Sequence, residues 1–273
     1  MTAGGCAHMK KPVSVLLLLA LMLCLSAGAF AQTPEPAPLP PLVTVRPAPD
    51  VDVAAVFVQK NKQPFTRESG RIVNLDSIWI YFTDGTFDQF VLIDDLPVLF
   101  SQGNYRFENG GSFIFAPDAK DFGDIVISRT MKYDALKGLV PYESEHTYAL
   151  NTLGFNQLYP GKDVGKKLVA FFVGPAKQPF RDGMIDSYWL YFDDSSFRQF
   201  ACVLGAPIPF SEGTYALADG SSFNYEEDES DFGQITITRT MKFQEGKNYA
   251  AYASEHTYEL NTLGFSLLIL DQD

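Results

Sequence analysis

Residues 77–91 read Ser77-Ile-Trp-Ile-Tyr-Phe82, then Thr-Asp-Gly, then Thr86-Phe-Asp-Gln-Phe-Val91. This stretch predicts two β-strands around a tight turn, because aromatic and β-branched residues favour strands and Asp84-Gly85 supplies the positive φ of hairpin turns. The same pattern returns as Ser187-Tyr-Trp-Leu-Tyr-Phe192 and Ser196-Phe-Arg-Gln-Phe-Ala201. No glycine stands in the second turn, so we expect a looser turn there. The stretch indicates an antiparallel sheet that the chain encodes twice.

The repetition covers most of the chain. Asp76 to Phe155 aligns with Asp186 to Phe265 at a constant offset of 110 without a gap, with 40 identities in 80 pairs. Upstream, Lys62-Gln-Pro-Phe65 matches Lys177-Gln-Pro-Phe180 at an offset of 115. Solenoid repeats have periods of about 20 to 50 residues, so a period this long indicates a duplicated domain. We predict two similar domains, residues 51–160 and 167–271.

The apolar residues within each copy alternate with a period of two. Ile125, Ile127, Arg129 and Met131 share one face of a predicted strand, and their equivalents in the second copy repeat the pattern. Further strands are expected at 53–58, 103–108, 112–116, 144–150 and 153–158, and no helix is expected. The predicted fold class is all-β, with six to eight short strands per copy forming a small antiparallel barrel or sandwich.

The N-terminal segment has the layout of a secretory signal. Lys10-Lys11 precedes the apolar run 13–25, and Ala29-Phe-Ala31 offers small residues at a cleavage site. The run is shorter than the roughly 20 residues that a membrane-spanning helix needs. We predict a signal peptide over residues 1–31, with Met1 or Met9 as the start, and export to the periplasm or outside of a bacterial cell. Residues 32–50 are rich in proline and predict an extended linker.

The charge and the cysteines restrict the partners further. The chain carries a net charge of −12, which disfavours nucleic-acid binding because phosphates would be repelled. Cleavage after Ala31 removes Cys6 and Cys24 and leaves only Cys202. We therefore expect no intramolecular disulfide and a buried structural thiol at Cys202.

At the level of fold, each copy resembles the small lipocalin-like (calycin) domains of secreted bacterial proteins. The resemblance rests on the aromatic strand Trp79-Ile-Tyr-Phe82, the Asp84-Gly-Thr-Phe87 turn, Gly103-Asn-Tyr105, a strand ending in Arg129 and the closing segment Tyr148-Ala-Leu-Asn-Thr-Leu153. It covers about residues 77–158 and 187–268. It lacks the Gly-x-Trp opening of true lipocalins. The family implies an up-and-down barrel with room for a ligand, but a fold does not fix a function.

The candidate binding residues are polar or aromatic groups that the strand period places inside each copy. His146 and Tyr148 share a strand face, and Arg129 lies among apolar neighbours. A buried guanidinium must be paired or stacked, so the candidate partners are Asp76, Asp121 and Glu145 with their second-copy equivalents, and Trp79 or Trp189 as a cation-π face. The candidate ligand-binding set is Arg129, His146, Tyr148 and Trp79 in the first copy, and Arg239, His256, Tyr258 and Trp189 in the second.

Three classes of function follow from this pattern. The first is a non-catalytic binding module with one site per copy for a small amphipathic or anionic molecule. The second is a structural or interaction protein of the cell envelope, in which the same polar residues form a network inside filled barrels. The third and least favoured is a hydrolase, because Ser144, Glu145 and His146 are strand neighbours that cannot converge. We expect no catalytic residue, cofactor or metal, and no membrane span after signal cleavage.

Overall fold

The computed structural model describes residues 47–48, 50–67, 69–114, 123–132, 143–150, 156–161, 165–223, 233–242, 253–260 and 266–270. These residues lie in one compact unit, Pro40–Asp273. The predicted signal peptide and most of the predicted linker fall outside the described residues. Within the part of the chain that is described, no helix is long and apolar enough to cross a membrane.

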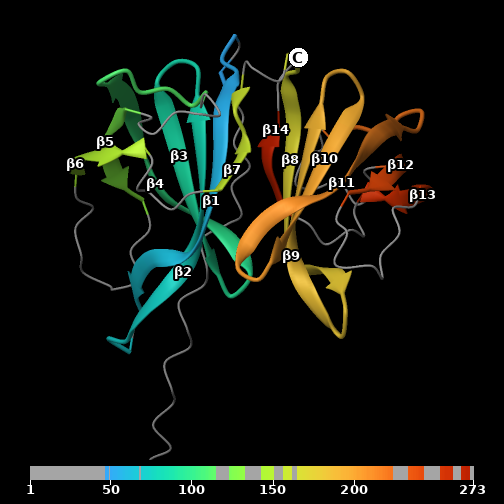
Figure 1. Ribbon diagram of the computed structural model, residues 1–273, viewed down its shortest axis with the longest axis horizontal. Helices are drawn as coiled ribbons and strands as arrows, with labels where there is room; N and C mark the ends of the chain where they lie inside the picture. The colour runs from blue at the N-terminus through green and yellow to red at the C-terminus, as the bar shows by residue number, and fades with distance from the viewer. Residues whose placement is uncertain are drawn as a thin grey trace, which may run out of the picture. The chain divides into compact units, whose positions relative to one another are not determined.

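Each copy forms one antiparallel sheet of seven strands (Figure 1). The first sheet has the order β6-β5-β4-β3-β2-β1-β7 and the second the order β13-β12-β11-β10-β9-β8-β14. The first copy contains β1 (Val53–Thr66), β2 (Ile72–Phe82), β3 (Thr86–Ile93), β4 (Leu96–Glu108), β5 (Asp124–Met131), β6 (Glu143–Ala149) and β7 (Asn156–Tyr159). The second contains β8 (Leu168–Phe180), β9 (Gly183–Phe192), β10 (Ser196–Val203), β11 (Ala206–Leu217), β12 (Gln234–Met241), β13 (Ala253–Glu259) and β14 (Ser266–Leu270).

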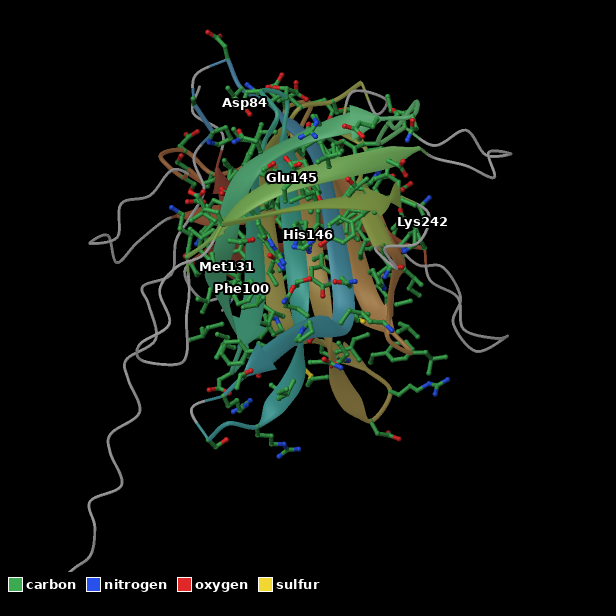
Figure 2. The ribbon with its side chains drawn as sticks, turned by 90° about the vertical axis from the view of Figure 1, so that its left-hand side faces the viewer. Asp84, Phe100, Met131, Glu145, His146 and Lys242 are labelled. Atoms are coloured by element: carbon green, nitrogen blue, oxygen red, sulfur yellow. The ribbon has the colours of Figure 1, made fainter. Side chains whose placement is uncertain are left out.

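The first sheet is curled. Its edge strands β6 and β7 follow one another in the chain, and the seven Cα steps from Ala149 to Asn156 span at most about 25 Å. In a flat sheet, six strand spacings would hold these edges about 29 Å apart. The sheet therefore bends its edges toward each other. Figure 2 shows the green strands of this half-barrel crossing in front of the blue strand β1.

The curl encloses an aromatic cluster, which we call the first inner cluster. It joins side chains from β1, β2, β3 and β5, although β1 and β5 are separated by three strands in the sheet. Its buried members are Ala55, Phe57, Trp79, Tyr81, Phe87, Phe113, Ile125 and Ile127. The second copy has an equivalent inner cluster of Ala170, Phe172, Trp189, Tyr191, Phe197, Phe223, Ile235, Ile237 and Leu260.

The opposite faces of the two sheets pack together in a shared core. On β2, Ile78, Ile80 and Phe82 belong to this core, whereas Trp79 and Tyr81 between them belong to the first inner cluster. This alternation explains why residues 77–82 form a continuous apolar run, since both faces of the strand are buried. The second copy supplies the other half of the shared core, with Leu168, Phe171, Val173, Tyr188, Leu190 and Phe192.

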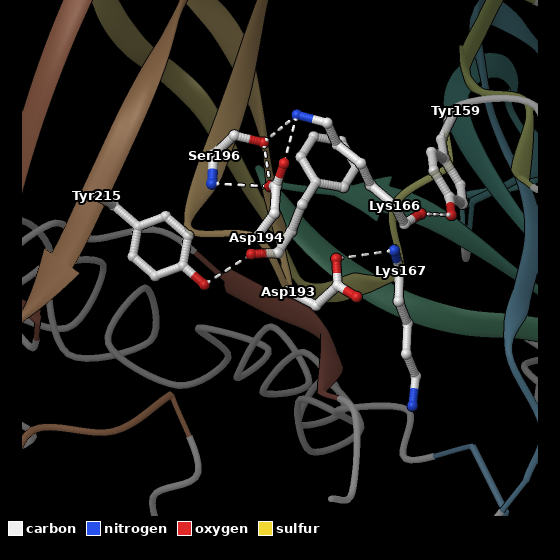
Figure 3. A network of polar contacts seen from close by, with 8 residues as sticks. Tyr159, Lys166, Lys167, Asp193, Asp194, Ser196 and Tyr215 are labelled. Atoms are coloured by element: carbon white, nitrogen blue, oxygen red, sulfur yellow. Dashed lines mark hydrogen bonds and ion pairs between the residues drawn. The ribbon is translucent and has the colours of Figure 1, made fainter.

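The segment between the copies is held by polar contacts (Figure 3). The Tyr159 hydroxyl donates to the carbonyl of Lys166 at 2.7 Å, and the ammonium of Lys166 lies 2.7 Å from Asp194 Oδ2. The backbone N–H of Lys167 donates to Asp193 Oδ1 at 3.1 Å. Hydrogen bonding, first of all from Lys166, lowers the pKa of Asp194 to about 2. Lys166 and Lys167 therefore attach this segment to both copies.

The all-β class and the number of strands per copy are confirmed among the described residues. The predicted strand at 112–116 is wrong over 112–114, which follow the end of β4 without pairing, and its last two positions lie outside the described residues. The expectation of a looser turn in the second copy is wrong. Ser195 adopts a positive φ (62°), as Gly85 does in the first copy (85°), and Asp194 Oδ1 accepts from the Ser196 N–H as Asp84 does from Thr86.

Candidate functional site

Arg129 lies on the inner face of β5, opposite Ser144 on β6 and Gly103 on β4. Its side chain is half-buried. Its Nε donates to Ser144 Oγ at 3.4 Å, and its Nη1 donates to Gln89 Oε1 at 3.4 Å. Both bonds are long and both acceptors are neutral, so the guanidinium keeps most of its capacity to bind an anion.

Buried amides and hydroxyls surround this arginine. Gln89 and Ser101 are fully buried, and the Ser101 hydroxyl donates to Gln89 Oε1 at 2.6 Å. Gln89 in turn donates through Nε2 to Gln63 Oε1 at 2.8 Å. We call the group Gln63, Ser77, Gln89, Ser101, Arg129 and Ser144 the polar layer. It lies on the same face of the sheet as the inner cluster, because Phe87 and Gln89 alternate on β3 with Asp88, which lies on the opposite face and is buried.

The second copy rebuilds this polar layer with the same residue types. Ser211 donates to Gln199 Oε1 at 2.6 Å, and Gln199 donates to Gln178 Oε1 at 2.6 Å. Arg239 Nε donates to Ser254 Oγ at 3.3 Å. Ser187 is again fully buried. The two layers thus agree in composition and, for these bonds, in geometry.

The carboxylate partners expected for Arg129 are elsewhere. Asp76 binds Lys60 instead, and Glu145 points to the outer face, where it accepts from Arg106 at 3.2 Å and from Ser128 at 2.8 Å. Asp121 lies outside the described residues. Among the residues that the structure describes, no carboxylate pairs with Arg129 or with its equivalent in the second copy.

The predicted tryptophans are interior residues. Trp79 is 4% exposed, stacks on Phe87 with ring centroids 5.5 Å apart, and donates its indole N–H to Ser77 Oγ at 3.1 Å. Trp189 repeats the arrangement, with a 5.4 Å stack on Phe197. These indoles form the boundary between the polar layer and the aromatic rings of the inner cluster rather than an exposed lining.

His146 and Tyr148 lie on the edge strand β6. His146 is opposite the buried Ile127, so it projects from the inner face as predicted, yet its side chain is exposed because β6 has a sheet neighbour on one side only (Figure 2). Tyr148 is half-buried, with its ring 5.9 Å from the imidazole. His256 and Tyr258 form the same pair at 6.0 Å. Each copy therefore places its arginine, histidine and tyrosine along the rim of the inner face.

The sequence reasoning missed the buried members of the polar layer. Gln89, Ser101 and Ser77 are each identical in the second copy, and Gln89 alternates with Phe87 on one predicted strand. That alternation is the signal that would have identified a polar group inside the fold. A fully buried glutamine is unusual enough to deserve selection as a candidate.

A second polar cluster lies between the two sheets. The ammonium of Lys60 on β1 binds Asp76 of the first copy and lies 2.5 Å from Asp186 Oδ2 of the second. Burial alone would lower the pKa of Lys60, but the hydrogen bonds that its ammonium donates to Asp186 and Asp76 outweigh burial and raise the pKa above its usual value. Asp76 and Asp186 are equivalent in the repeat, whereas Pro175 stands where Lys60 would recur. Lys60 thus joins the two copies.

Cys202 is buried and free, as expected, and burial raises the pKa of its thiol. Among the described residues, no group of three or more His, Cys, Asp or Glu side chains is arranged to hold a metal ion. Comparison of the chain with protein-family models, with curated proteins and with solved structures finds no match.

Proposed function

We propose that this protein is an exported, non-catalytic binding module in which each copy is a small lipocalin-like barrel holding one amphipathic, anionic molecule. The signal-peptide pattern of residues 1–31 supports export to the periplasm or outside of a bacterial cell. The proposed barrel would form if the curled sheet closed on itself. Its two edge strands, β6 and β7, are consecutive in the chain, which favours this closure. The ligand is a molecule with a carboxylate and an apolar part.

The observation that carries this proposal is a half-buried arginine, present twice, that binds only neutral side chains among the described residues. Arg129 has Ser144 and Gln89 as its acceptors, and Arg239 has Ser254. A guanidinium presents a planar fork that matches a carboxylate in two parallel hydrogen bonds. Neutral neighbours hold the arginine in place without neutralising it, so a ligand acid would complete the site.

The remaining candidates have roles that follow from their positions. His146 and Tyr148, at the rim of the inner face, would contact the ligand acid and the start of its apolar part. The aromatic rings behind Trp79 and Trp189 supply an apolar environment for the rest of the molecule.

The structural alternative also has an observation in its favour. The inner cluster is densely aromatic, with the Tyr81 and Phe113 ring centroids 4.8 Å apart and Tyr81 and Tyr105 in edge contact at 5.1 Å. If these rings fill the interior, the polar layer fixes the register of the strands and binds nothing. In that case the protein would be a scaffold or interaction protein of the cell envelope.

Thermal unfolding in the presence of fatty acids, bile acids and sugars distinguishes the two functions. We expect a fatty acid or bile acid, and no neutral sugar, to raise the midpoint of unfolding. At a hundred times the dissociation constant, one site gains about 2.7 kcal/mol. The double variant Arg129→Gln with Arg239→Gln should lose this shift.

The matched control for this measurement is Arg106→Gln. Arg106 is an exposed arginine of β4 that contacts Glu108 and Glu145 on the outer face, so its loss changes the net charge without touching the polar layer. The control should keep the ligand-induced shift. A midpoint that no compound moves, together with a large loss of stability in the double variant, would favour the structural function.

A further inference from the structure

We propose that the hairpin ends of the second copy dock this protein onto the surface of an anionic lipid bilayer. Leu204 and Met184 insert below the headgroups, and neighbouring basic side chains contact the headgroups themselves. Leu204 lies in the turn between β10 and β11, and Met184 lies at the start of β9. The inference does not rest on the ligand site, because neither residue belongs to the polar layer.

Leu204 is unusual both in exposure and in backbone conformation. Its side chain is 97% exposed, and its φ is +52°. Exposure removes any gain from burying the leucine, and a positive φ is unfavourable for a bulky side chain. The first copy has Asp94 at the equivalent position, with a φ of +50°, and aspartate is a residue that such hairpin turns favour. The fold itself therefore gives no reason for a leucine in this turn.

Met184 is the second exposed apolar residue at this end of the sheet. Its side chain is 51% exposed, and the repeat aligns it with the polar Asn74. The pairing of β9 with β10 ends at Ser187 and Ala201, and the same register continued for three residues brings Met184 level with Leu204. In Figure 1 the β8–β9 hairpin and the β10–β11 turn both lie at the lower end of the second sheet. The two apolar side chains thus lie on neighbouring hairpin ends.

The β8–β9 hairpin is basic although the chain is acidic. Over residues 177–184, Lys177 and Arg181 outnumber the single acid Asp182, and all three side chains are exposed. An anionic bilayer attracts lysine and arginine to its surface and takes up apolar side chains just beneath the headgroups. Basic and apolar side chains together on one hairpin end match both properties of such a surface.

The first copy adds cations at the same end of the molecule. Lys60 contacts an aspartate of each copy, so the β1–β2 and β8–β9 hairpins begin side by side, and both lie at the lower end in Figures 1 and 2. Residues 62–72 hold three cations and one acid, and Ile72 is 68% exposed. The β3–β4 turn carries two aspartates, of which Asp94 contacts Arg67 at 3.7 Å. These segments hold five cations and four acids, whereas the whole chain has 21 and 33.

The placement of these side chains favours a bilayer over a protein partner. The exposed apolar residues lie on separate hairpin ends, and exposed basic residues lie beside them. A protein partner would need a shaped pocket for each projecting side chain. A fluid lipid layer accepts separate projections without such pockets, because its chains rearrange around them.

Flotation with lipid vesicles tests the proposal. The wild-type protein is mixed with vesicles of phosphatidylcholine and phosphatidylglycerol in equal parts, or of phosphatidylcholine alone, and is centrifuged in a density gradient. It should float with the anionic vesicles and float less with the neutral ones. High salt should release part of the bound protein, because salt screens the contacts of lysine and arginine with the headgroups.

The deciding variant gives the second copy the residues of the first. Met184→Asn with Leu204→Asp introduces the residue types of Asn74 and Asp94 at their equivalent positions. The unfolding midpoint should not fall, because aspartate before Gly205 suits the turn. Binding to anionic vesicles should fall about tenfold, because two apolar side chains no longer insert. The shift in unfolding caused by a fatty acid should remain, because the polar layer is unchanged.

Two further variants separate insertion from charge and from exposure in general. Met184→Asn with Leu204→Asn leaves the net charge unchanged and should lose binding to a similar degree. Ile114→Asn likewise takes the residue of the other copy, Asn224, and removes a side chain that is 44% exposed. Ile114 follows the end of β4 that is remote from the β3–β4 turn, so this variant should bind vesicles like the wild type.

Three results would overturn the proposal. The first is wild-type protein that does not float with anionic vesicles, or that floats equally well with neutral ones. The second is a Met184→Asn, Leu204→Asp variant that is folded and binds as well as the wild type. The third is self-association of the wild type without lipid that this variant abolishes, which would make the hairpin ends an interface between copies of the chain.

Discussion

Replacing Lys60 by methionine is expected to lower the free energy of unfolding by about 3 to 5 kcal/mol at neutral pH, which is the cost of leaving a buried charge without its partner. Methionine keeps most of the side-chain volume and removes the ammonium that binds Asp76 and Asp186. The two carboxylates would then repel each other at the boundary between the copies. Urea unfolding followed by tryptophan fluorescence measures the loss.

The pH dependence of this loss identifies its cause. The difference in the free energy of unfolding between wild type and variant should shrink at alkaline pH, where Lys60 loses its proton. In the wild type, the raised pKa of Lys60 means that its contribution is complete below about pH 10 and is lost as the pH rises through the folded-state pKa.

Lys62→Met is the control for this experiment, because Lys62 is an exposed lysine two residues away on the same strand. It should change the free energy of unfolding by less than about 0.5 kcal/mol. Equal losses in the two lysine variants, or a Lys60→Met loss that does not depend on pH, would show that the Lys60 contacts are not what joins the copies.

Gly103→Ala should cost about 2 to 3 kcal/mol of stability. A Cβ at this position would lie 1.9 Å from the backbone carbonyl oxygen of Ser128 and 2.8 Å from the Cα of Arg129, so β4 and β5 would have to separate beside the polar layer. Gly213 meets the same conflict, with the carbonyl oxygen of Thr238 at 2.0 Å. Differential scanning calorimetry of both variants should show comparable losses.

Gly183→Ala provides the matched comparison. Gly183 is an exposed strand glycine without a positive φ, and a Cβ there would have no heavy atom within 4 Å. Alanine at this position should leave the stability unchanged or raise it slightly. If Gly103→Ala were as stable as Gly183→Ala, the close approach of β4 to β5 beside Arg129 would be wrong.

The sequence predicted those parts of the fold that leave a pattern in neighbouring residues or in the repeat. The period of two located the strand Asp124–Met131, and the offsets of 110 and, upstream, 115 relate the strands of one copy to those of the other. The prediction of a strand over 112–114 is wrong because Phe113 is apolar for a different reason. It packs into the inner cluster from a segment that connects two strands. Burial, rather than strand formation, explains its residue type.

The remaining features depend on contacts between residues far apart in the chain. Lys60 and Asp186 are separated by 126 residues, and the duplication hides their contact because Pro175 replaces the lysine in the second copy. For Arg129 the expectation of a carboxylate partner came from the cost of burying a charge. In the structure, the Arg129 side chain is only partly buried, and it donates to the neutral acceptors Gln89 and Ser144 instead of a carboxylate.

The central claim is that each copy holds one anionic amphipath through its half-buried arginine, and isothermal titration calorimetry with a long-chain fatty acid tests it most directly. The account predicts two bound equivalents for the wild type, one for Arg129→Gln, one for Arg239→Gln and none for the double variant. All four proteins should retain their circular dichroism. Absence of binding by the wild type, or a stoichiometry that neither arginine variant changes, would contradict it.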